Sequence, residues 1–222
     1  VFLMEDSTVQ AANSSFAIPR GGSEGLEEAQ VHLKDDTDLV PSESKSAVTV
    51  SSLVKGVRHN GSEEVKSFDE IGALYGFEYA NRLVVEHEKD LRTMLVSWGV
   101  DKDIFPTAGS LGIEEMLING DINPKLELRD IDSVLGAGLF ALKDIAAGEF
   151  IGEYVGLMRQ AVTKPSGYAL NFPSGGEARE VDGKHIANLM RFCNHSRNMN
   201  CDFKGVWLDT CAHVCIFASE RV

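Results

Sequence analysis

From residue 126 onward, hydrophobic and polar residues alternate in short runs that favour β-strands. The clearest runs are residues 126–129, 150–155 and 212–218, and glycine-rich stretches typical of turns separate them. A parallel doubly wound sheet would need helical runs of about ten residues between its strands, and this part of the sequence has none. We therefore predict an α+β fold in which short antiparallel strands dominate the second half of the chain.

Residues 67–98 show the hydrophobic spacing of an amphipathic helix. Ser67 precedes the pattern and Glu70 follows three residues later, which is the sequence of a capping box. Gly99 comes just after the last hydrophobic residue, where it would end the helix. The sequence predicts one long or twice-interrupted helix over residues 68–98.

A second helix is predicted over residues 110–119, with Ser110 as its N-cap and Gly120 just past its end. The two helices define a helical lead-in over residues 67–124, ahead of a β-rich domain over residues 125–222. We expect this lead-in to cover an exposed edge of a β-sheet.

Residues 1–66 are rich in Ser, Gly, Asp and Glu and have little hydrophobic periodicity. Such a segment buries too little apolar surface to offset the entropy cost of ordering, so we predict a disordered acidic arm. Residues 47–54 alternate weakly, and they would form a strand only if another strand paired with them.

The chain of 222 residues carries 34 acidic and 21 basic residues, giving a formal net charge of -13. This charge argues against direct binding to nucleic acid, because phosphate backbones require clusters of Lys and Arg. A basic protein or peptide is the partner that it attracts. No apolar run reaches the length of about 18 residues that a membrane span needs, so we expect a soluble protein without a membrane partner.

The cysteines lie close together in the sequence, at Cys193, Cys201, Cys211 and Cys215. They are too few and too clustered for a disulfide framework, which favours a reducing compartment. Cys211, His213 and Cys215 would share one face of a strand. Zinc knuckles usually turn within a Cys-x-x-Cys pair instead, so we predict no metal site.

Residues 136–141 match the Gly-x-Gly-x-x-Ala pattern of dinucleotide-binding loops. That interpretation, an NAD-type oxidoreductase, requires a helix to begin at the glycines. Gly148 and the β-type run after it leave room for only about one and a half helical turns. The oxidoreductase is therefore the less favoured alternative.

Residues 188–201 are dense in asparagine and include His195. Asparagine side chains hydrogen-bond nearby backbone groups in tight turns. The segment therefore predicts an irregular loop that its own side chains pin in place.

Taken in order, four blocks of the sequence resemble those of a SET domain, the fold of protein-lysine methyltransferases that use S-adenosyl-L-methionine. The blocks are residues 136–149, 153–156, 168–182 and 188–200. The helical segment ahead of them and the lack of cysteine-rich flanks are similar to the bacterial, chlamydia-like SET proteins. The resemblance implies a SET-type β-clip over residues 125–222.

The resemblance also implies a cofactor site for S-adenosyl-L-methionine. In the family, the backbone around the first block approaches the cofactor, a tyrosine lines the same site, and an Asn-His pair holds the adenine and amino-acid ends. These contacts carry over to Leu135, Gly136, Ala137, Gly138, Tyr168, Asn194 and His195.

Two residues carry over to the methyl-transfer step. Tyr154 matches the tyrosine that borders the transfer channel, and Phe203 stands where some members have a tyrosine. Without that hydroxyl the lysine amine has more room, so Phe203 favours di- or trimethylation. The lysine must first lose its proton, which costs about three pKa units near neutral pH, and burial in a dry channel lowers this cost.

SET domains finish with an Asp-Tyr pair whose tyrosine is the main catalytic hydroxyl, and we expect it to lie beyond Val222. The implied activity is methyl transfer to a lysine of a basic peptide, histone tails being the family's usual substrate. The alternative is an inactive SET fold that binds a peptide or a cofactor. The expected compartment is the cytoplasm or, for a secreted bacterial effector, the nucleus of the host cell.

Overall fold

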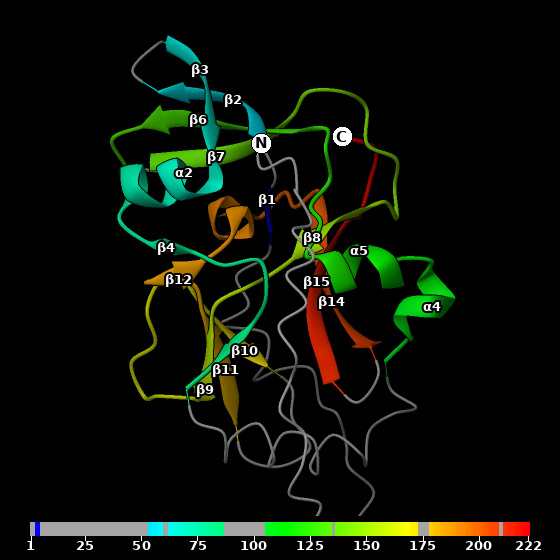
Figure 1. Ribbon diagram of the computed structural model, residues 1–222. Coiled ribbons are helices and arrows are strands. Elements are labelled where there is room, and N and C mark those ends of the chain that lie inside the picture. Colours follow the sequence, from blue (N-terminus) through cyan, green and yellow to red (C-terminus); the bar gives the residue numbers. More distant parts are fainter. Residues whose placement is uncertain are drawn as a thin grey trace, which may run out of the picture.

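Figure 1 shows the computed structural model, which describes residues 3–4, 53–59, 62–86, 105–134, 136–172, 178–208 and 211–222. These residues form several small sheets of short strands, with a few short helices packed around them. This is the α+β class that the alternating pattern predicted. In this part of the chain no helix has the length and apolar composition that crossing a bilayer requires.

The first sheet has the strand order β3-β2-β6-β7. Its strands are β2 (Leu53–His59), β3 (Ser62–Ser67), β6 (Leu126–Asp132) and β7 (Gly136–Ala141). β2 pairs antiparallel with β3 and parallel with β6, where Val57 lies beside Leu128. The prediction of a disordered arm over residues 1–66 is therefore wrong for residues 53–59 and 62–66, because β6 supplies the partner that this segment lacks by itself. It is also wrong for Leu3–Met4, which form a strand, and residues 5–52 lie outside the described residues.

A second sheet has the order β14-β15-β8 and is antiparallel throughout. It consists of β8 (Phe150–Glu153), β14 (Cys201–Leu208) and β15 (Cys211–Ala218). Cys215 of β15 lies opposite Glu153 of β8. The strands predicted near residues 150–155 and 212–218 are both confirmed.

The third sheet has the order β10-β11-β9-β5 and includes a strand from the lead-in. Its members are β5 (Val84–Val85), β9 (Leu157–Gln160), β10 (Ala169–Phe172) and β11 (Arg179–Asp182). Two small parallel pairs complete the strands: β4 (Glu78–Tyr79) with β12 (Ile186–Ala187), and β1 (Leu3–Met4) with β13 (Asn194–His195). The lead-in thus adds strands, rather than a helix, beside β9 and β12.

Helix α2 (Phe68–Tyr75) is much shorter than the predicted helix over residues 68–98. Its capping box is confirmed, because the Glu70 amide donates to the Ser67 hydroxyl at 3.3 Å and the Ser67 amide donates to the Glu70 carboxylate at 2.7 Å. The helix ends at Gly76, whose φ of 73° is a left-handed conformation that glycine adopts without strain. Residues 87–98 of the prediction lie outside the described residues.

The second predicted helix is divided into α4 (Ala108–Leu111) and α5 (Glu114–Asn119) by a left-handed Gly112. The N-cap is Thr107, whose hydroxyl accepts a hydrogen bond from the Ser110 amide at 3.1 Å, so the prediction of Ser110 as the cap is wrong. Gly120 ends α5 as predicted.

The main hydrophobic core joins the three sheets beneath helix α2 and the turn of 3-10 helix η1 (Leu189–Phe192). Its fully buried side chains come from different strands and from η1, and include Leu128, Leu139, Ile151, Met158, Met190 and Ile216. Ala137 and Phe192 belong to this core, so close packing holds the backbone around them in place.

Candidate active site

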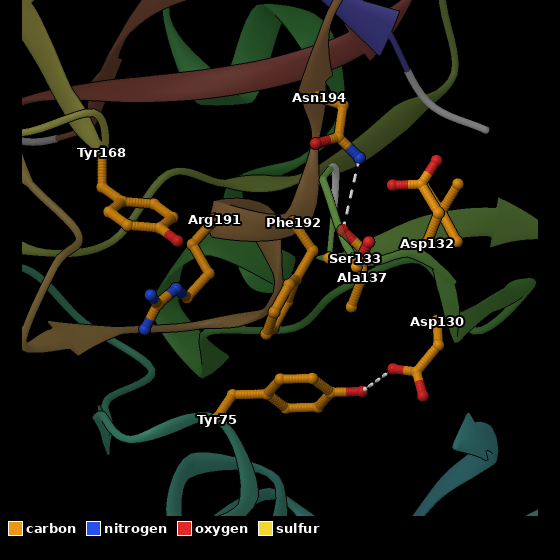
Figure 2. Close-up of a pocket in the computed structure, with 11 residues that line it drawn as sticks. Tyr75, Asp130, Asp132, Ser133, Ala137, Tyr168, Arg191, Phe192 and Asn194 are labelled. Carbon is orange, nitrogen blue, oxygen red and sulfur yellow. Dashed lines mark hydrogen bonds between the residues drawn. The ribbon is translucent and has the colours of Figure 1, made fainter. Parts of the chain in front are cut away.

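A pocket of about 520 Å³ lies where α2, the end of β6, the start of β7 and the segment around η1 come together (Figure 2). Aromatic rings, carboxylates and a guanidinium share its wall. The lining residues are Tyr75, Asp130, Ile131, Asp132, Ser133, Gly136, Ala137, Tyr168, Arg191, Phe192 and Asn194. The pocket thus combines segments that lie more than a hundred residues apart in the sequence.

Four of the seven predicted cofactor residues line this pocket: Gly136, Ala137, Tyr168 and Asn194. Gly138 does not line the pocket, but its backbone lies close to the side chain of Asn194. Leu135 lies outside the described residues. His195 is exposed on β13 and is not among the lining residues, so the structure does not bring it to the pocket.

Asn194 connects the two motifs that the sequence singled out. Its side-chain amide donates a hydrogen bond to the backbone oxygen of Ala137 at 3.3 Å, which Figure 2 shows as a dashed line. A Cβ atom at position 138 would lie 2.9 Å from the Asn194 amide nitrogen and 2.7 Å from Cδ1 of Ile131. A side chain at position 138 would therefore displace the side chain of Asn194 or of Ile131.

The asparagine-rich segment is pinned by side chains, as its composition predicted. The side-chain oxygen of Asn188 caps η1 by accepting a hydrogen bond from the Met190 amide at 3.0 Å. Its side-chain nitrogen donates to the backbone oxygen of Glu153 at 2.8 Å. Asn188 is 2% exposed, so this one amide ties η1 firmly to the end of β8.

Arg191 brings a buried positive charge to the pocket, and sequence reasoning assigned it no role. It is 8% exposed, and its guanidinium carbon lies 4.3 Å from the ring centres of both Phe77 and Tyr168. One terminal nitrogen donates to the backbone oxygen of Lys184 at 3.4 Å. Its Nε atom is buried without a hydrogen-bond partner in the described part of the chain.

Tyr75 and Asp130 were also missed by sequence reasoning. Tyr75 is the last residue of α2, and its hydroxyl donates to Asp130 of β6 at 2.9 Å (Figure 2). Burial, reinforced by this hydrogen bond, raises the pKa of the Tyr75 phenol. Neither residue belongs to a recognisable motif, so only the meeting of α2 with β6 in three dimensions could reveal them.

The two residues predicted for methyl transfer lie close to each other but do not line the pocket. The rings of Tyr154 and Phe203 meet edge to face, with their centres 6.0 Å apart. The Tyr154 hydroxyl donates to the backbone oxygen of Tyr168 at 2.6 Å, which links it to the pocket wall. Burial raises the pKa of the Tyr154 phenol, so the hydroxyl stays protonated at neutral pH.

The Gly-x-Gly pattern lies in strand β7, which pairs antiparallel with β6. The NAD-type alternative required a helix at this point, and the structure has a strand there instead. Of the candidate zinc ligands, His213 directs Nδ1 to the Glu153 carboxylate at 2.7 Å, and the thiol of Cys215 is buried. The side chain of Cys211 lies outside the described residues.

Comparison with known proteins identifies the β-rich part of the chain. The family model of the SET domain matches residues 136–222. Over these residues the chain is similar to SET domains. The match begins at Gly136 and includes Tyr168, Arg191 and Asn194 of the pocket.

Two curated proteins are similar to parts of this chain. Histone-lysine N-methyltransferase SETD1 of Drosophila melanogaster is 31% identical over 125 residues, which cover 51% of this chain and 8% of that protein. Histone-lysine N-methyltransferase trithorax of Drosophila virilis is 36% identical over 95 residues, covering 39% of this chain and 2% of that protein. The chain therefore spans only a small fraction of either relative's length.

Among solved structures, SUVH6 of Arabidopsis thaliana, crystallised in complex with SAM, is similar to this chain. The identity is 25% and the TM-score is 0.39, over 45% of this chain and 25% of that chain.

Proposed function

We propose that this chain is the SET-domain part of a protein-lysine methyltransferase that uses S-adenosyl-L-methionine. The observation that carries the proposal is the pocket itself. Gly136, Ala137, Tyr168 and Asn194, which the family resemblance assigns to the cofactor, converge on one cavity from separate parts of the chain.

The residues of the pocket suit this cofactor chemically. Arg191 lines the pocket with a positive charge that favours the carboxylate of the amino-acid end. Gly136 and Ala137 offer backbone groups at the pocket wall, and Asn194 holds that backbone in place. When bound, the cofactor supplies an activated methyl group on a sulfonium ion.

The chain's own residues would then prepare the substrate lysine. We assign Tyr154 and Phe203 to the wall of the lysine channel, where buried rings exclude water and favour the neutral amine. The Tyr154 hydroxyl keeps its proton and points at the Tyr168 backbone, so it acts in positioning rather than as a base.

The proposed substrate is a lysine in a basic peptide such as a histone tail. The net charge of -13 favours the approach of Lys-rich and Arg-rich segments, because charge complementarity raises encounter rates. The names of the two relatives, both histone-lysine N-methyltransferases, support the same substrate class. The small number and close clustering of the cysteines in the sequence support our proposal of a reducing compartment.

Titration of S-adenosyl-L-methionine into the 222-residue chain by calorimetry tests this function. We expect the wild-type chain to bind, and Asn194→Ala to weaken binding about tenfold because the Ala137 backbone loses its anchor. Asn198→Ala is the matched control, since Asn198 is exposed in the same segment and does not line the pocket.

A methyl-transfer assay on basic peptides completes the test. Transfer that depends on Asn194 supports the enzyme. A folded chain that shows no heat at millimolar cofactor concentrations contradicts the cofactor proposal. The transfer assay is run on a longer chain that includes the C-terminal tyrosine expected from the family resemblance, and peptide binding without transfer by that chain would favour the alternative of an inactive binding module.

A further inference from the structure

Tyr168 lines the pocket from an exposed turn, yet its backbone is held on both sides. The residue is 41% exposed, and Figure 2 shows its ring beside Arg191. Its backbone oxygen accepts hydrogen bonds from the Tyr154 hydroxyl at 2.6 Å and from the Gly183 amide at 3.0 Å. Its backbone amide donates to the hydroxyl oxygen of Ser166 at 3.1 Å. Both polar groups of the Tyr168 backbone are therefore bound by other residues.

Ser166 is itself oriented by Asp182, the last residue of β11. The Ser166 hydroxyl donates to Oδ1 of Asp182 at 2.6 Å, so a lone pair of its oxygen faces the Tyr168 amide. A hydroxyl that donates to a carboxylate becomes a better acceptor, so the first hydrogen bond strengthens the second. Ser166 thus links the end of β11 to the turn that carries Tyr168.

The carboxylate of Asp182 has a fixed position because further donors hold it. Asp182 is 6% exposed. Its Oδ2 accepts a hydrogen bond from the Arg159 guanidinium at 2.8 Å, and its Oδ1 accepts one from the Lys184 amide at 3.0 Å. Arg159 also donates to the buried carboxylate of Glu180 at 2.8 Å. Since charge-assisted hydrogen bonds of this kind are strong and directional, Asp182 can orient the Ser166 hydroxyl.

We propose that Ser166, held by Asp182 and Arg159, is a positioning residue that sets the place of the Tyr168 ring at the pocket. The inference rests on the proposed function, because the affinity that it affects is the affinity for S-adenosyl-L-methionine. Ser166 and Arg159 lie outside the four sequence blocks of the SET resemblance, which assigns them no role. Loss of the Ser166 hydroxyl frees the Tyr168 amide, so the ring is in its binding orientation for a smaller fraction of the time.

Ser166→Ala in the 222-residue chain removes the hydroxyl and nothing else. The hydrogen bond to the Tyr168 amide is exposed, so water replaces the lost partner and the fold should persist. We expect calorimetry to give an affinity for S-adenosyl-L-methionine about threefold lower than that of the wild type. Ser166→Thr keeps a hydroxyl at this position and should return the affinity to within about 1.5-fold of the wild type.

A double-mutant cycle with Tyr168→Ala separates positioning from a general structural role. If Ser166 acts through the Tyr168 ring, Ser166→Ala should change the affinity by less than about 1.5-fold once that ring is absent. Hydrogen exchange at the Tyr168 amide, measured without cofactor, should be about fivefold faster in Ser166→Ala.

Ser110→Ala is the matched control. It also removes an exposed hydroxyl that makes a hydrogen bond, here to the Thr107 backbone oxygen at 2.7 Å, and Ser110 does not line the pocket. This variant should leave both the affinity and the exchange at Tyr168 unchanged.

Wild-type affinity in Ser166→Ala would overturn the inference while leaving the proposed function intact. An equal loss of affinity with and without the Tyr168 ring would overturn it as well, because Ser166 would then act by another route. If the wild-type chain binds no cofactor, the proposed function fails and the inference about affinity fails with it, whereas faster exchange in Ser166→Ala would still show that Ser166 holds the Tyr168 backbone.

Discussion

The hydroxyl of Tyr154 donates a hydrogen bond to the backbone oxygen of Tyr168 at 2.6 Å. Tyr154 is 4% exposed just after β8, whereas Tyr168 is 41% exposed at the pocket. The Gly183 amide donates to the same backbone oxygen at 3.0 Å. A buried tyrosine therefore fixes the position of an exposed one, and connects the proposed lysine channel to the proposed cofactor site.

Tyr154→Phe is expected to lower the free energy of unfolding by about 1 kcal/mol, since the Gly183 amide still satisfies the Tyr168 oxygen after the hydroxyl is lost. Cofactor affinity should fall about threefold because the Tyr168 backbone becomes less constrained. Urea unfolding and calorimetry measure the two effects. Tyr79→Phe is the control, because the Tyr79 hydroxyl has no hydrogen-bond partner among the described residues. A Tyr154→Phe variant with unchanged affinity would argue against a positioning role.

Two local signals in the sequence predicted helix ends correctly, whereas the predicted N-cap at Ser110 was wrong. The capping box at Ser67 and the stop at Gly120 depend only on neighbouring residues, and both are confirmed. The continuous helix after Tyr75 was wrong because apolar residues there face strands from far along the chain. β5 pairs with β9 and β4 pairs with β12, and no local pattern encodes those partners.

The residues of the candidate site also fall into two groups, those that the sequence could predict and those that only the fold reveals. Gly136, Ala137, Tyr168 and Asn194 could be found because they belong to motifs whose order is visible in the sequence, and the structure brings them to one pocket. Tyr75 and Asp130 could not be found, because they are 55 positions apart and meet only when α2 packs beside β6. Arg191 stood within a motif, but its buried and unpartnered Nε is a property of the fold.

Gly138→Ala is expected to impair binding more than folding. The added Cβ would meet Cδ1 of Ile131 at 2.7 Å and the Asn194 amide nitrogen at 2.9 Å, and both atoms are ends of side chains that can move. We expect a stability loss of about 1 kcal/mol but a loss of cofactor affinity of about tenfold, because Asn194 moves off the Ala137 backbone. Thermal unfolding and calorimetry separate the two effects.

Gly167→Ala is the matched control for this change, since a Cβ at position 167 would meet no atom of the described residues within 4 Å. It should leave both stability and affinity unchanged. A Gly138→Ala variant that unfolds without any change in affinity per folded molecule would show that Asn194 does not depend on this close approach.

Phe203→Tyr tests whether residue 203 controls the number of methyl groups that are added to the lysine. The Phe203 ring lies edge to face with Tyr154 at 6.0 Å, so a tyrosine here would add a hydroxyl beside the proposed lysine channel. That hydroxyl can hold the amine or a water molecule and leaves less room for added methyl groups. We expect a shift from di- and trimethylated products toward monomethylation in mass spectra of a lysine peptide. A wild-type enzyme that yields only monomethyl-lysine would contradict the proposal.

Glu149 should make the folded chain less stable in acid, because its carboxylate accepts several hydrogen bonds just before β8. Its carboxylate accepts hydrogen bonds from Lys125 Nζ at 2.7 and 2.9 Å, from the Ala146 amide at 3.0 Å and from the Asn123 side chain at 2.9 Å. These donors, Lys125 first, lower the pKa of Glu149 from 4.5 to about 2. The negative charge is therefore more stable in the folded chain than in the unfolded chain.

Because the folded pKa is the lower one, the stabilisation is complete above a pH of about 4.5 and is lost as the pH falls toward about 2. Glu149→Gln should cost about 2 kcal/mol in urea unfolding at neutral pH, and the difference from wild type should fall to about half or less at a pH of about 3. Asp144→Asn is the control, because Asp144 pairs with Arg221 where both side chains are about three-quarters exposed (74% and 75%), and should cost little. A Glu149→Gln penalty that stays constant with pH would mean that packing, rather than the ionised carboxylate, provides the stability.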